Sequence, residues 1–216
     1  MTLKFYTGSG SPYAWRVHLA LEHKALAYET ELLSFSAGDT RKPEFLALNP
    51  RGRVPLIDDG GFVLYESTAI VEYLDEAYPG RGAPLFPGDA LQRATVRRLV
   101  SEVAGDLAPV VEKLLDQAFL KPEERMPDAV AAAREAVREQ FGFFVRAMRG
   151  PYLAGSLSAA DYTLYPYAAF LFRVESTRMP EVRAAELLPP ELIAWRERIE
   201  ALPFFPVTYP PHWRKA

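Results

Sequence analysis

A serine at the start of a predicted helix is the residue best placed to do chemistry in this sequence. Ser11 follows the loop Gly8-Ser9-Gly10 and precedes Pro12, a pattern that predicts an N-cap serine with proline at the first helical position. A helix N-terminus presents unpaired N–H groups and about half a positive charge. A hydroxyl at this point can donate a hydrogen bond to an anion and stabilise it. Ser11 is therefore a candidate catalytic residue.

Two nearby side chains are alternatives for the same task. Tyr6 ends the first predicted strand, where a packed strand residue is the simpler interpretation, and Ser9 lies in the loop just before Ser11. The loop itself lacks the third glycine and the spacing of a dinucleotide or phosphate loop, which excludes that use. Ser11 is favoured, with Tyr6 and Ser9 left open.

The chain contains no cysteine among its 216 residues. This excludes disulfides, thiolate–zinc sites, iron–sulfur clusters and a nucleophilic thiolate of the protein's own. The histidines His18, His23 and His212 form no metal set, since the first two face different sides of one predicted helix. We expect no metal, and any reactive sulfur must arrive with a ligand.

Composition narrows the class of protein further. The net charge of −3 argues against a sequence-independent nucleic-acid binder, which would be basic. No apolar run approaches the length of a membrane span, and the N-terminus begins with a strand-like segment rather than a leader. We expect a cytoplasmic protein of one or two domains that binds neither nucleic acid nor membrane.

The elements that position these residues fall into two regions. Residues 1–80 follow the order β-α-β-α-β-β-α, in which a helical crossover makes the first two strands parallel and a hairpin at Asp59-Gly60-Gly61 adds an antiparallel edge. The predicted strands are Leu3–Tyr6, Tyr28–Leu33, Val54–Asp58 and Phe62–Tyr65, and the predicted helices cover 12–24 and 43–48 and a third starting at Glu66-Ser67.

Strand patterns vanish after the turn-rich connector at residues 81–87. The predicted helices are 89–120 (one helix, or two broken near Pro109), one capped by Asp128 and ending near Met148, Tyr162–Val174, and Pro190–Ala201. Ser158 and Asp161 form a capping-box pattern before the third of them, which we interpret as structural. A tail rich in proline and aromatic residues follows.

Three short motifs each begin one of the predicted elements of residues 1–80. Ser11-Pro12-Tyr13-Ala14-Trp15-Arg16 begins the first helix, Arg53-Val54-Pro55 begins the third strand, and Glu66-Ser67 begins the third helix. Over nearly the whole chain this resembles the cytosolic glutathione transferase superfamily, in particular serine-type bacterial-like members with a zeta- or tau-like N-terminal motif. The resemblance implies an α/β thioredoxin-like N-terminal domain, residues 1–80, and an all-α C-terminal domain, residues 88–216, that forms the electrophile site.

The resemblance also implies roles for single residues. Ser11 would donate to the glutathione thiolate, and Val54, before a cis Pro55, would pair through its backbone with the cysteinyl unit. Arg53, with Lys42 or Arg41, would face the glycine carboxylate. Glu66 would accept from the γ-glutamyl ammonium group, and Ser67 as N-cap would leave N–H donors for the carboxylate beside it. Aromatic residues proposed to contact the electrophile are Tyr13, Phe119 and Trp213.

Three functions are compatible with these motifs. A glutathione transferase would conjugate the thiolate to a largely apolar electrophile and form a homodimer, as the family does. A maleylacetoacetate isomerase-like enzyme would add and then eliminate glutathione. Trp15-Arg16 favours this second function, whereas Pro12-Tyr13 resembles other serine-type classes. A non-catalytic binding protein on the same fold is the third, because fold alone does not define function.

Overall fold

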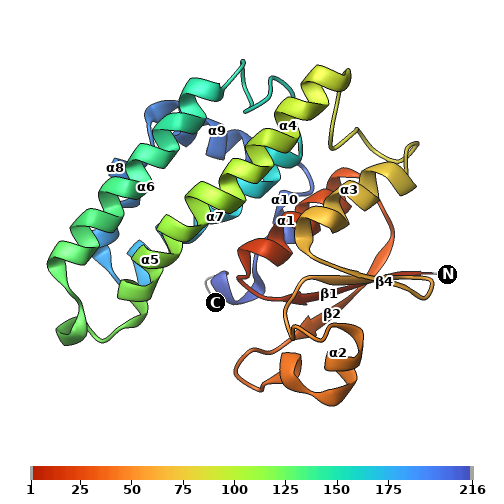
Figure 1. Cartoon of the computed structure of the whole chain (residues 1–216), viewed down its shortest axis with the longest axis horizontal. Coiled ribbons are helices and arrows are strands. Elements are labelled where there is room, and N and C mark those ends of the chain that lie inside the picture. Colours follow the sequence, from red (N-terminus) through yellow and green to blue (C-terminus); the bar gives the residue numbers. More distant parts are fainter. Residues whose placement is uncertain (1, 215–216) are drawn as a thin grey trace. The chain divides into compact units, whose positions relative to one another are not determined.

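The computed structural model describes residues 2–214, which form two compact units (Figure 1). The first unit contains residues 2–87 together with the C-terminal segment 203–214, and the second contains Gly88–Leu202. The expected C-terminal domain was 88–216, so its last part lies in the other unit. Aromatic packing of that segment on the first helix, described below, accounts for the difference.

A four-stranded mixed sheet forms the centre of the first unit. Its strands are β1 (Leu3–Gly8), β2 (Tyr28–Leu33), β3 (Leu56–Asp59) and β4 (Phe62–Tyr65), in the order β2-β1-β3-β4. The β1–β2 pair is parallel, as a helical crossover requires, and the β1–β3 and β3–β4 pairs are antiparallel. The predicted parallel pairing of the first two strands and the predicted antiparallel hairpin are confirmed, and β3 begins at Leu56 rather than Val54.

Helices cover both faces of this sheet. On one face α1 (Pro12–His23) and α3 (Ser67–Ala77) pack together, and Phe5 of β1 contacts His18 of α1 at 5.5 Å between ring centroids. On the other face lies α2 (Pro43–Leu48), where the Tyr6 ring packs on Phe45 at 6.2 Å (Figure 1). Alternation along β1 therefore directs Phe5 toward α1 and Tyr6 toward α2.

Strand register brings three separate segments to one edge of the sheet. Leu56, the first residue of β3, pairs with Tyr6 of β1 and with Tyr65, the last residue of β4. The loop from β1 to α1, the Val54-Pro55 peptide and the start of α3 therefore all adjoin the same edge. Two helices, α1 and α3, begin there, so their positive N-terminal ends share it.

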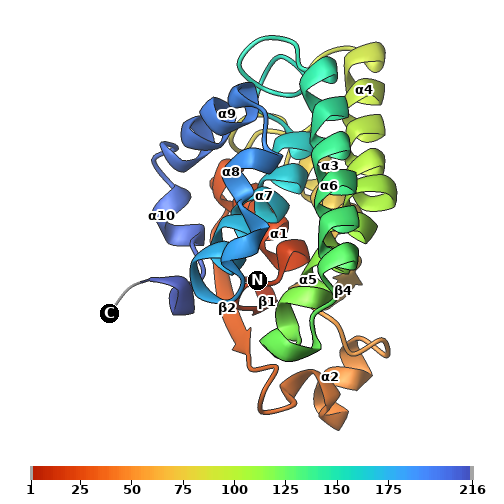
Figure 2. The same cartoon turned by 90° about the vertical axis from the view of Figure 1, so that its left-hand side faces the viewer.

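The second unit is helical, as predicted. Within it α6 runs alongside α5, and α4 contacts α7 (Figure 2). Its helices are α4 (Ala90–Glu102), α5 (Ala108–Phe119), α6 (Pro127–Ala147), α7 (Ala159–Thr177), α8 (Ala184–Leu187) and α9 (Pro190–Glu200). Shorter pieces of the whole chain are η1 (Asp39–Arg41), the π turn η2 (Val103–Leu107), η3 (Pro122–Glu124), η4 (Pro180–Val182), α10 (Phe205–Thr208) and η5 (Pro211–Trp213).

The predicted region 89–120 forms two helices separated by the π turn, which is the alternative with a break near Pro109, and Pro109 lies in the first turn of α5. One predicted helix start changes. Asp128 was expected to cap α6, but the N-cap is Met126 and Asp128 lies in the first turn. A carboxylate there is still favourable, because it faces the positive end of the helix.

The capping box at the start of α7 is buried within the second unit. Asp161 accepts hydrogen bonds from the Ser158 N–H at 2.9 Å, the Leu153 N–H at 3.0 Å and the Trp195 indole at 2.8 Å. Ser158 and Asp161 are completely buried. Burial raises the pKa of Asp161 to about 6, against the lowering effect of its hydrogen bonds. The expected structural role is confirmed.

Candidate active site

Ser11 occupies the N-cap of α1. Its backbone is extended, with φ −70° and ψ 120°, and its Oγ accepts a hydrogen bond from the Ala14 N–H at 3.3 Å. The side chain is half-buried. A serine hydroxyl has one donor hydrogen besides its lone pairs, so accepting from Ala14 leaves this hydrogen able to point at an anion.

The next segment at the same edge contains a cis peptide bond between Val54 and Pro55, as predicted. Asn49 holds the residues that precede this cis bond. Its Nδ2 donates to the Arg53 carbonyl at 2.7 Å, and its Oδ1 accepts from the Arg51 N–H at 3.0 Å. Asn49 is buried, with 2 % of its surface exposed. Asn49 directly follows the predicted helix 43–48 and was not predicted as a site residue. Both of its contacts are local, to residues two and four positions further along the chain.

The start of α3 differs from the expectation. Ser67 is the first helical residue rather than the N-cap, and the N-cap is Glu66. Glu66 has φ +73° and ψ 106°, a conformation that costs a residue with a side chain about 1–3 kcal/mol. The first turn of α3 is Ser67, Thr68 and Ala69, which carry no charge, so the positive helix end is not neutralised from within the turn.

The cationic candidates lie at the surface. Lys42 forms an ion pair with Asp39 at 2.7 Å, and the pKa of Lys42 is raised by this hydrogen bond. Lys42 and Asp39 also line a cavity of about 350 Å³ with Tyr6 and Phe45. The Arg53 side chain is exposed, and its backbone carbonyl is the group that Asn49 holds.

Both alternatives to Ser11 have other contacts. The half-buried Tyr6 packs against α2, on the face of the sheet opposite α1. The Ser9 hydroxyl hydrogen-bonds His212 of the C-terminal segment at 2.5 Å.

The aromatic candidates are placed in different environments. Tyr13 has 38 % of its surface exposed, with the Arg16 guanidinium 5.4 Å from its ring centroid. Trp213 is 5 % exposed and packs against Trp15 at 5.3 Å, so its position fits core packing better than a ligand wall. Phe119 belongs to the second unit, at the end of α5, and is 55 % exposed.

The described residues offer no metal centre. Within residues 2–214, no group of three or more His, Asp or Glu side chains could hold a metal ion. His18 lies between the rings of Phe5 and Tyr28, and burial lowers its pKa to about 4, so the ring is neutral at pH 7. None of the helices in the described part of the chain is long and apolar enough to cross a membrane.

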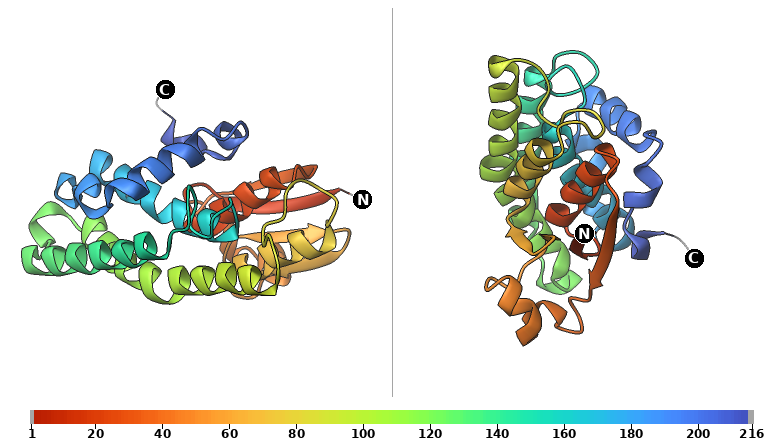
Figure 3. Two further views of the ribbon diagram at one scale, coloured as in Figure 1. Left: turned by 90° about the horizontal axis from the view of Figure 1, so that it is seen from above. Right: turned by 90° about the vertical axis from the view of Figure 1, so that its right-hand side faces the viewer.

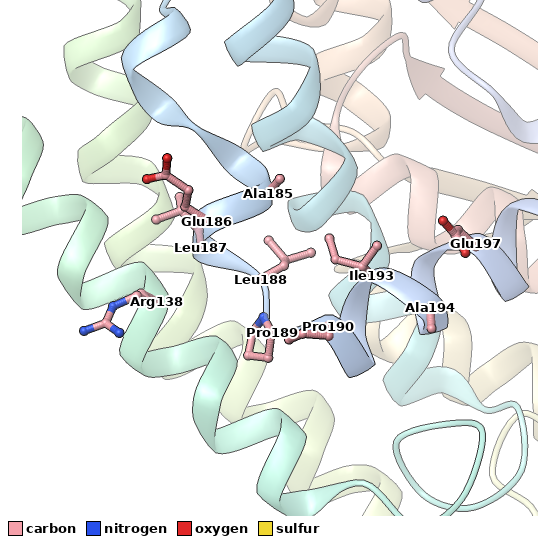
Figure 4. Close-up of a pocket in the computed structure, with 10 residues that line it drawn as sticks. All are labelled: Arg138, Ala185, Glu186, Leu187, Leu188, Pro189, Pro190, Ile193, Ala194 and Glu197. Atoms are coloured by element: carbon pink, nitrogen blue, oxygen red, sulfur yellow. The ribbon is translucent and has the colours of Figure 1, made fainter.

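A cavity of about 570 Å³ lies in the second unit, where α8 leads into α9 (Figure 4). Leu187, Leu188 and Ile193 give it an apolar floor, and Arg138 and Glu197 lie at its rim. None of the residues predicted from the sequence lines it. The candidate chemistry therefore lies at the edge of the sheet rather than in this cavity.

The first unit is thus a thioredoxin-like domain with a capping serine and a cis-proline at one edge, and the second is all-helical. Residues 10–77 match the family model described as "Glutathione S-transferase, N-terminal domain", and residues 107–203 match "Glutathione S-transferase, C-terminal domain". The chain belongs to the glutathione transferase family, and it is an enzyme of that family. The predicted fold class is confirmed.

Relatives of known name agree with this assignment. The chain is 32 % identical over 212 residues to glutathione S-transferase A of Pleuronectes platessa, covering 95 % of this chain and 90 % of the relative. It is 33 % identical over 193 residues to a probable maleylacetoacetate isomerase of Vibrio cholerae, covering 85 % and 88 %. A crystal structure of a glutathione S-transferase from the Antarctic clam Laternula elliptica superimposes with a TM-score of 0.85 at 28 % identity, covering 100 % of this chain and 95 % of that one.

Proposed function

We propose that the chain conjugates glutathione to an electrophilic, largely apolar substrate, with Ser11 stabilising the thiolate. The observation that carries the proposal is the position of the Ser11 hydroxyl at the N-terminus of α1. A free thiol has a pKa near 8.5, so little of it is ionised at neutral pH. A hydrogen bond from Ser11 and the positive end of α1 both favour the anion, which then attacks the electrophile.

The proposed glutathione contacts extend from Ser11 along the same edge of the sheet. The backbone of Val54, before cis Pro55, pairs with the cysteinyl unit, in a segment that Asn49 holds in place. At α3 the backbone N–H of Ser67 donates a hydrogen bond to the γ-glutamyl carboxylate, and Glu66 accepts one from the neighbouring ammonium group.

Arg53 and Lys42 are the proposed partners of the glycine carboxylate. Lys42 already pairs with Asp39, so its contribution is the smaller of the two. Tyr13 and Phe119 each present an exposed ring and are proposed to contact the electrophile. Trp213 is proposed to support the site by packing rather than by contact, because it is buried against Trp15.

A glutathione-dependent isomerase is the second candidate, favoured by the similarity to the Vibrio cholerae protein. The sequence motif that pointed to it has a packing explanation here. Trp15 is buried and donates to Thr208 at 3.1 Å, and the buried Arg16 reaches Thr68 of α3 at 3.4 Å. Trp15-Arg16 therefore does not by itself distinguish the two reactions.

Glutathione consumption separates the two reactions. The protein is first tested for retention on glutathione resin, and then incubated with glutathione and a panel that includes aryl halides, enones and a cis-unsaturated diketo acid. Conjugation consumes one glutathione per product, whereas isomerisation converts the diketo acid without net loss of the thiol. Retention without turnover of any compound would leave a binding protein and contradict both proposals.

We further propose that the enzyme acts in the cytoplasm in detoxification and functions as a homodimer without a metal. The family resemblance supports the dimer, and light scattering at micromolar concentration tests it. A monomer with full activity would refute the proposed dimer and leave the proposed reaction unaffected.

A further inference from the structure

The C-terminal segment 203–214, called the strap below, belongs to the same unit as the β1–α1 loop that leads to Ser11, and it is the last blue segment in Figure 3. The Ser9 hydroxyl and His212 Nδ1 are 2.5 Å apart, although 203 positions separate the two residues in the chain. Gly10 has φ +83°, and a Cβ built on it would lie 3.0 Å from Cε1 of His212 and 3.4 Å from Nε1 of Trp213. The strap therefore touches both residues directly before Ser11.

A second anchor lies on the other side of Ser11. The indole of Trp15, in the first turns of α1, donates to the Thr208 hydroxyl at 3.1 Å. Trp213 packs against Trp15 with the ring planes nearly perpendicular, 5.3 Å between centroids. Trp15, Thr208 and Trp213 are all at most 5 % exposed, so this anchor is part of the core. Ser11 is thus bracketed in sequence by residues that the strap holds.

The space between the loop and the strap is not filled. A cavity of about 100 Å³ lies there, lined by Ser9, Ser11, His18 and Thr30 on one side and residues 207–211 on the other. The lining of this cavity is mainly apolar, and no side chain fills the space between the loop and the strap. The Ser9–His212 hydrogen bond spans from the loop to the strap beside this space, so the loop depends on the strap for support that a packed core would otherwise give.

We propose that Ser9 and His212 are positioning residues for Ser11: the strap holds the β1–α1 loop so that the Ser11 hydroxyl points at the glutathione sulfur. This inference rests on the proposed function for its catalytic part. A donor that stabilises a developing or bound anion works only within a few tenths of an ångström of its correct place. Neither Ser9 nor His212 contacts the substrate in this proposal, and both act through Ser11.

The experiment compares Ser9→Ala, His212→Ala, the double variant and His212→Asn with wild type. Asparagine places its side-chain amide near the position of Nδ1 and can restore the hydrogen bond to Ser9. Arg214→Ala is the matched control, because Arg214 donates to the Pro206 carbonyl within the strap at 2.7 Å. The readouts are kcat and KM for glutathione, the melting temperature, and hydrogen exchange of residues 8–15.

The expected result is a loss in kcat of about tenfold for each single alanine variant, with the KM for glutathione and the melting temperature unchanged. The double variant loses no more than either single variant, because both remove one interaction. His212→Asn recovers most of the rate, and Arg214→Ala stays at the wild-type rate. Exchange of residues 8–15 accelerates in the alanine variants only.

Three outcomes would overturn the inference: additive losses in the double variant, an equal loss in Arg214→Ala, or exchange that is unchanged in both alanine variants. The exchange experiment needs no turnover. If the wild-type protein turns over no electrophile, the proposed function fails, while the exchange rates still decide whether the strap holds the loop.

Discussion

Ser11 and Ser158 each cap a helix, one in each unit, and the two caps are built differently. At α7 the partner Asp161 accepts from the Ser158 N–H at 2.9 Å and from its Oγ at 3.0 Å, and both residues are completely buried. At α1 the first turn is Pro12, Tyr13 and Ala14, which carry no charge, and Ser11 is half-buried. The cap of α7 is closed by a carboxylate of the chain, whereas the cap of α1 has none.

The difference leaves the two helix ends in different electrostatic environments. A carboxylate at the third helical position satisfies backbone donors and neutralises the positive helix end. Without it the same helix end remains attractive to an anion from outside, at the cost of part of the capping energy. We infer that the open cap of Ser11 is an adaptation to a ligand and that the closed cap of Ser158 is an adaptation to folding.

The largest expected effect is on the closed cap. Asp161→Ala leaves the Leu153 N–H, the Ser158 N–H and the Trp195 indole buried without their acceptor. We expect the free energy of unfolding to fall by about 3–5 kcal/mol, measured by urea denaturation followed by circular dichroism. Asp128→Ala is the control, since Asp128 is exposed in the first turn of α6, and it should cost less than about 1 kcal/mol. Equal losses would contradict the distinction.

The open cap should respond in activity rather than stability. Ser11→Ala removes one positioned donor, and we expect kcat to fall about 10- to 1000-fold while the free energy of unfolding falls by about 1 kcal/mol. Ser158→Ala should show the reverse, with a lower melting temperature and an unchanged kcat at 25 °C. Steady-state kinetics and calorimetry on the pair provide the measurement.

Tyr6→Phe tests whether Tyr6, rather than Ser11, is the catalytic residue. Its ring packs against α2, so removing the hydroxyl should leave kcat near the wild-type value. If Tyr6→Phe abolished activity while Ser11→Ala kept it, the catalytic assignment would move to β1 and the comparison of the two caps would lose its functional half.

These two caps also mark what the sequence could and could not predict. Ser11-Pro12 and Ser158 with Asp161 are local signals, and both predicted helix starts are confirmed to within a few residues. Glu66 was not predicted as N-cap, because serine caps far more often than glutamate. Glu66 adopts its positive φ between β4 and α3, at a position where a residue with a side chain rarely does.

The strap could not be predicted for a different reason. The Ser9–His212 and Trp15–Thr208 hydrogen bonds link positions about 200 residues apart, and neither residue pair forms a pattern in the sequence. The tail was therefore assigned to the helical region by adjacency alone. Helix caps can be predicted from the local order of residues, whereas contacts set by tertiary packing cannot.

The two units should also differ in how pH acts on their buried groups. Burial lowers the pKa of His18 to about 4, so the unfolded chain binds more protons than the folded one between pH 6.5 and 4. His18 therefore destabilises the fold as the pH falls through that window. The raised pKa of Asp161, about 6, has the opposite sign and destabilises the fold as the pH rises from about 4 to 6.

Replacing His18 separates the two effects. In His18→Gln the free energy of unfolding, relative to wild type, should increase by about 1–2 kcal/mol between pH 7 and pH 5. The measurement is urea denaturation at both values of pH. Burial also lowers the pKa of His23. His23→Gln should therefore also gain stability relative to wild type when the pH falls from 7 to 5. A relative stability of His18→Gln that is independent of pH would show that His18 is solvated in the folded state.

The smallest expected effect concerns the other open helix end, that of α3. Glu66 is exposed and only 3.9 Å from Arg51 at the surface, so its ion pair contributes little to stability. Glu66→Ala should raise the KM for glutathione about three- to tenfold through the loss of one charge-assisted contact, with kcat nearly unchanged. Glu66→Gln keeps an acceptor for the ammonium group, so its KM for glutathione should lie between those of wild type and Glu66→Ala. Arg51→Ala, which removes the surface partner alone, should leave KM at the wild-type value. If Arg51→Ala raised KM as much as Glu66→Ala, the pair would act by holding the turn into α3, and Glu66 would be a positioning residue instead of a ligand contact.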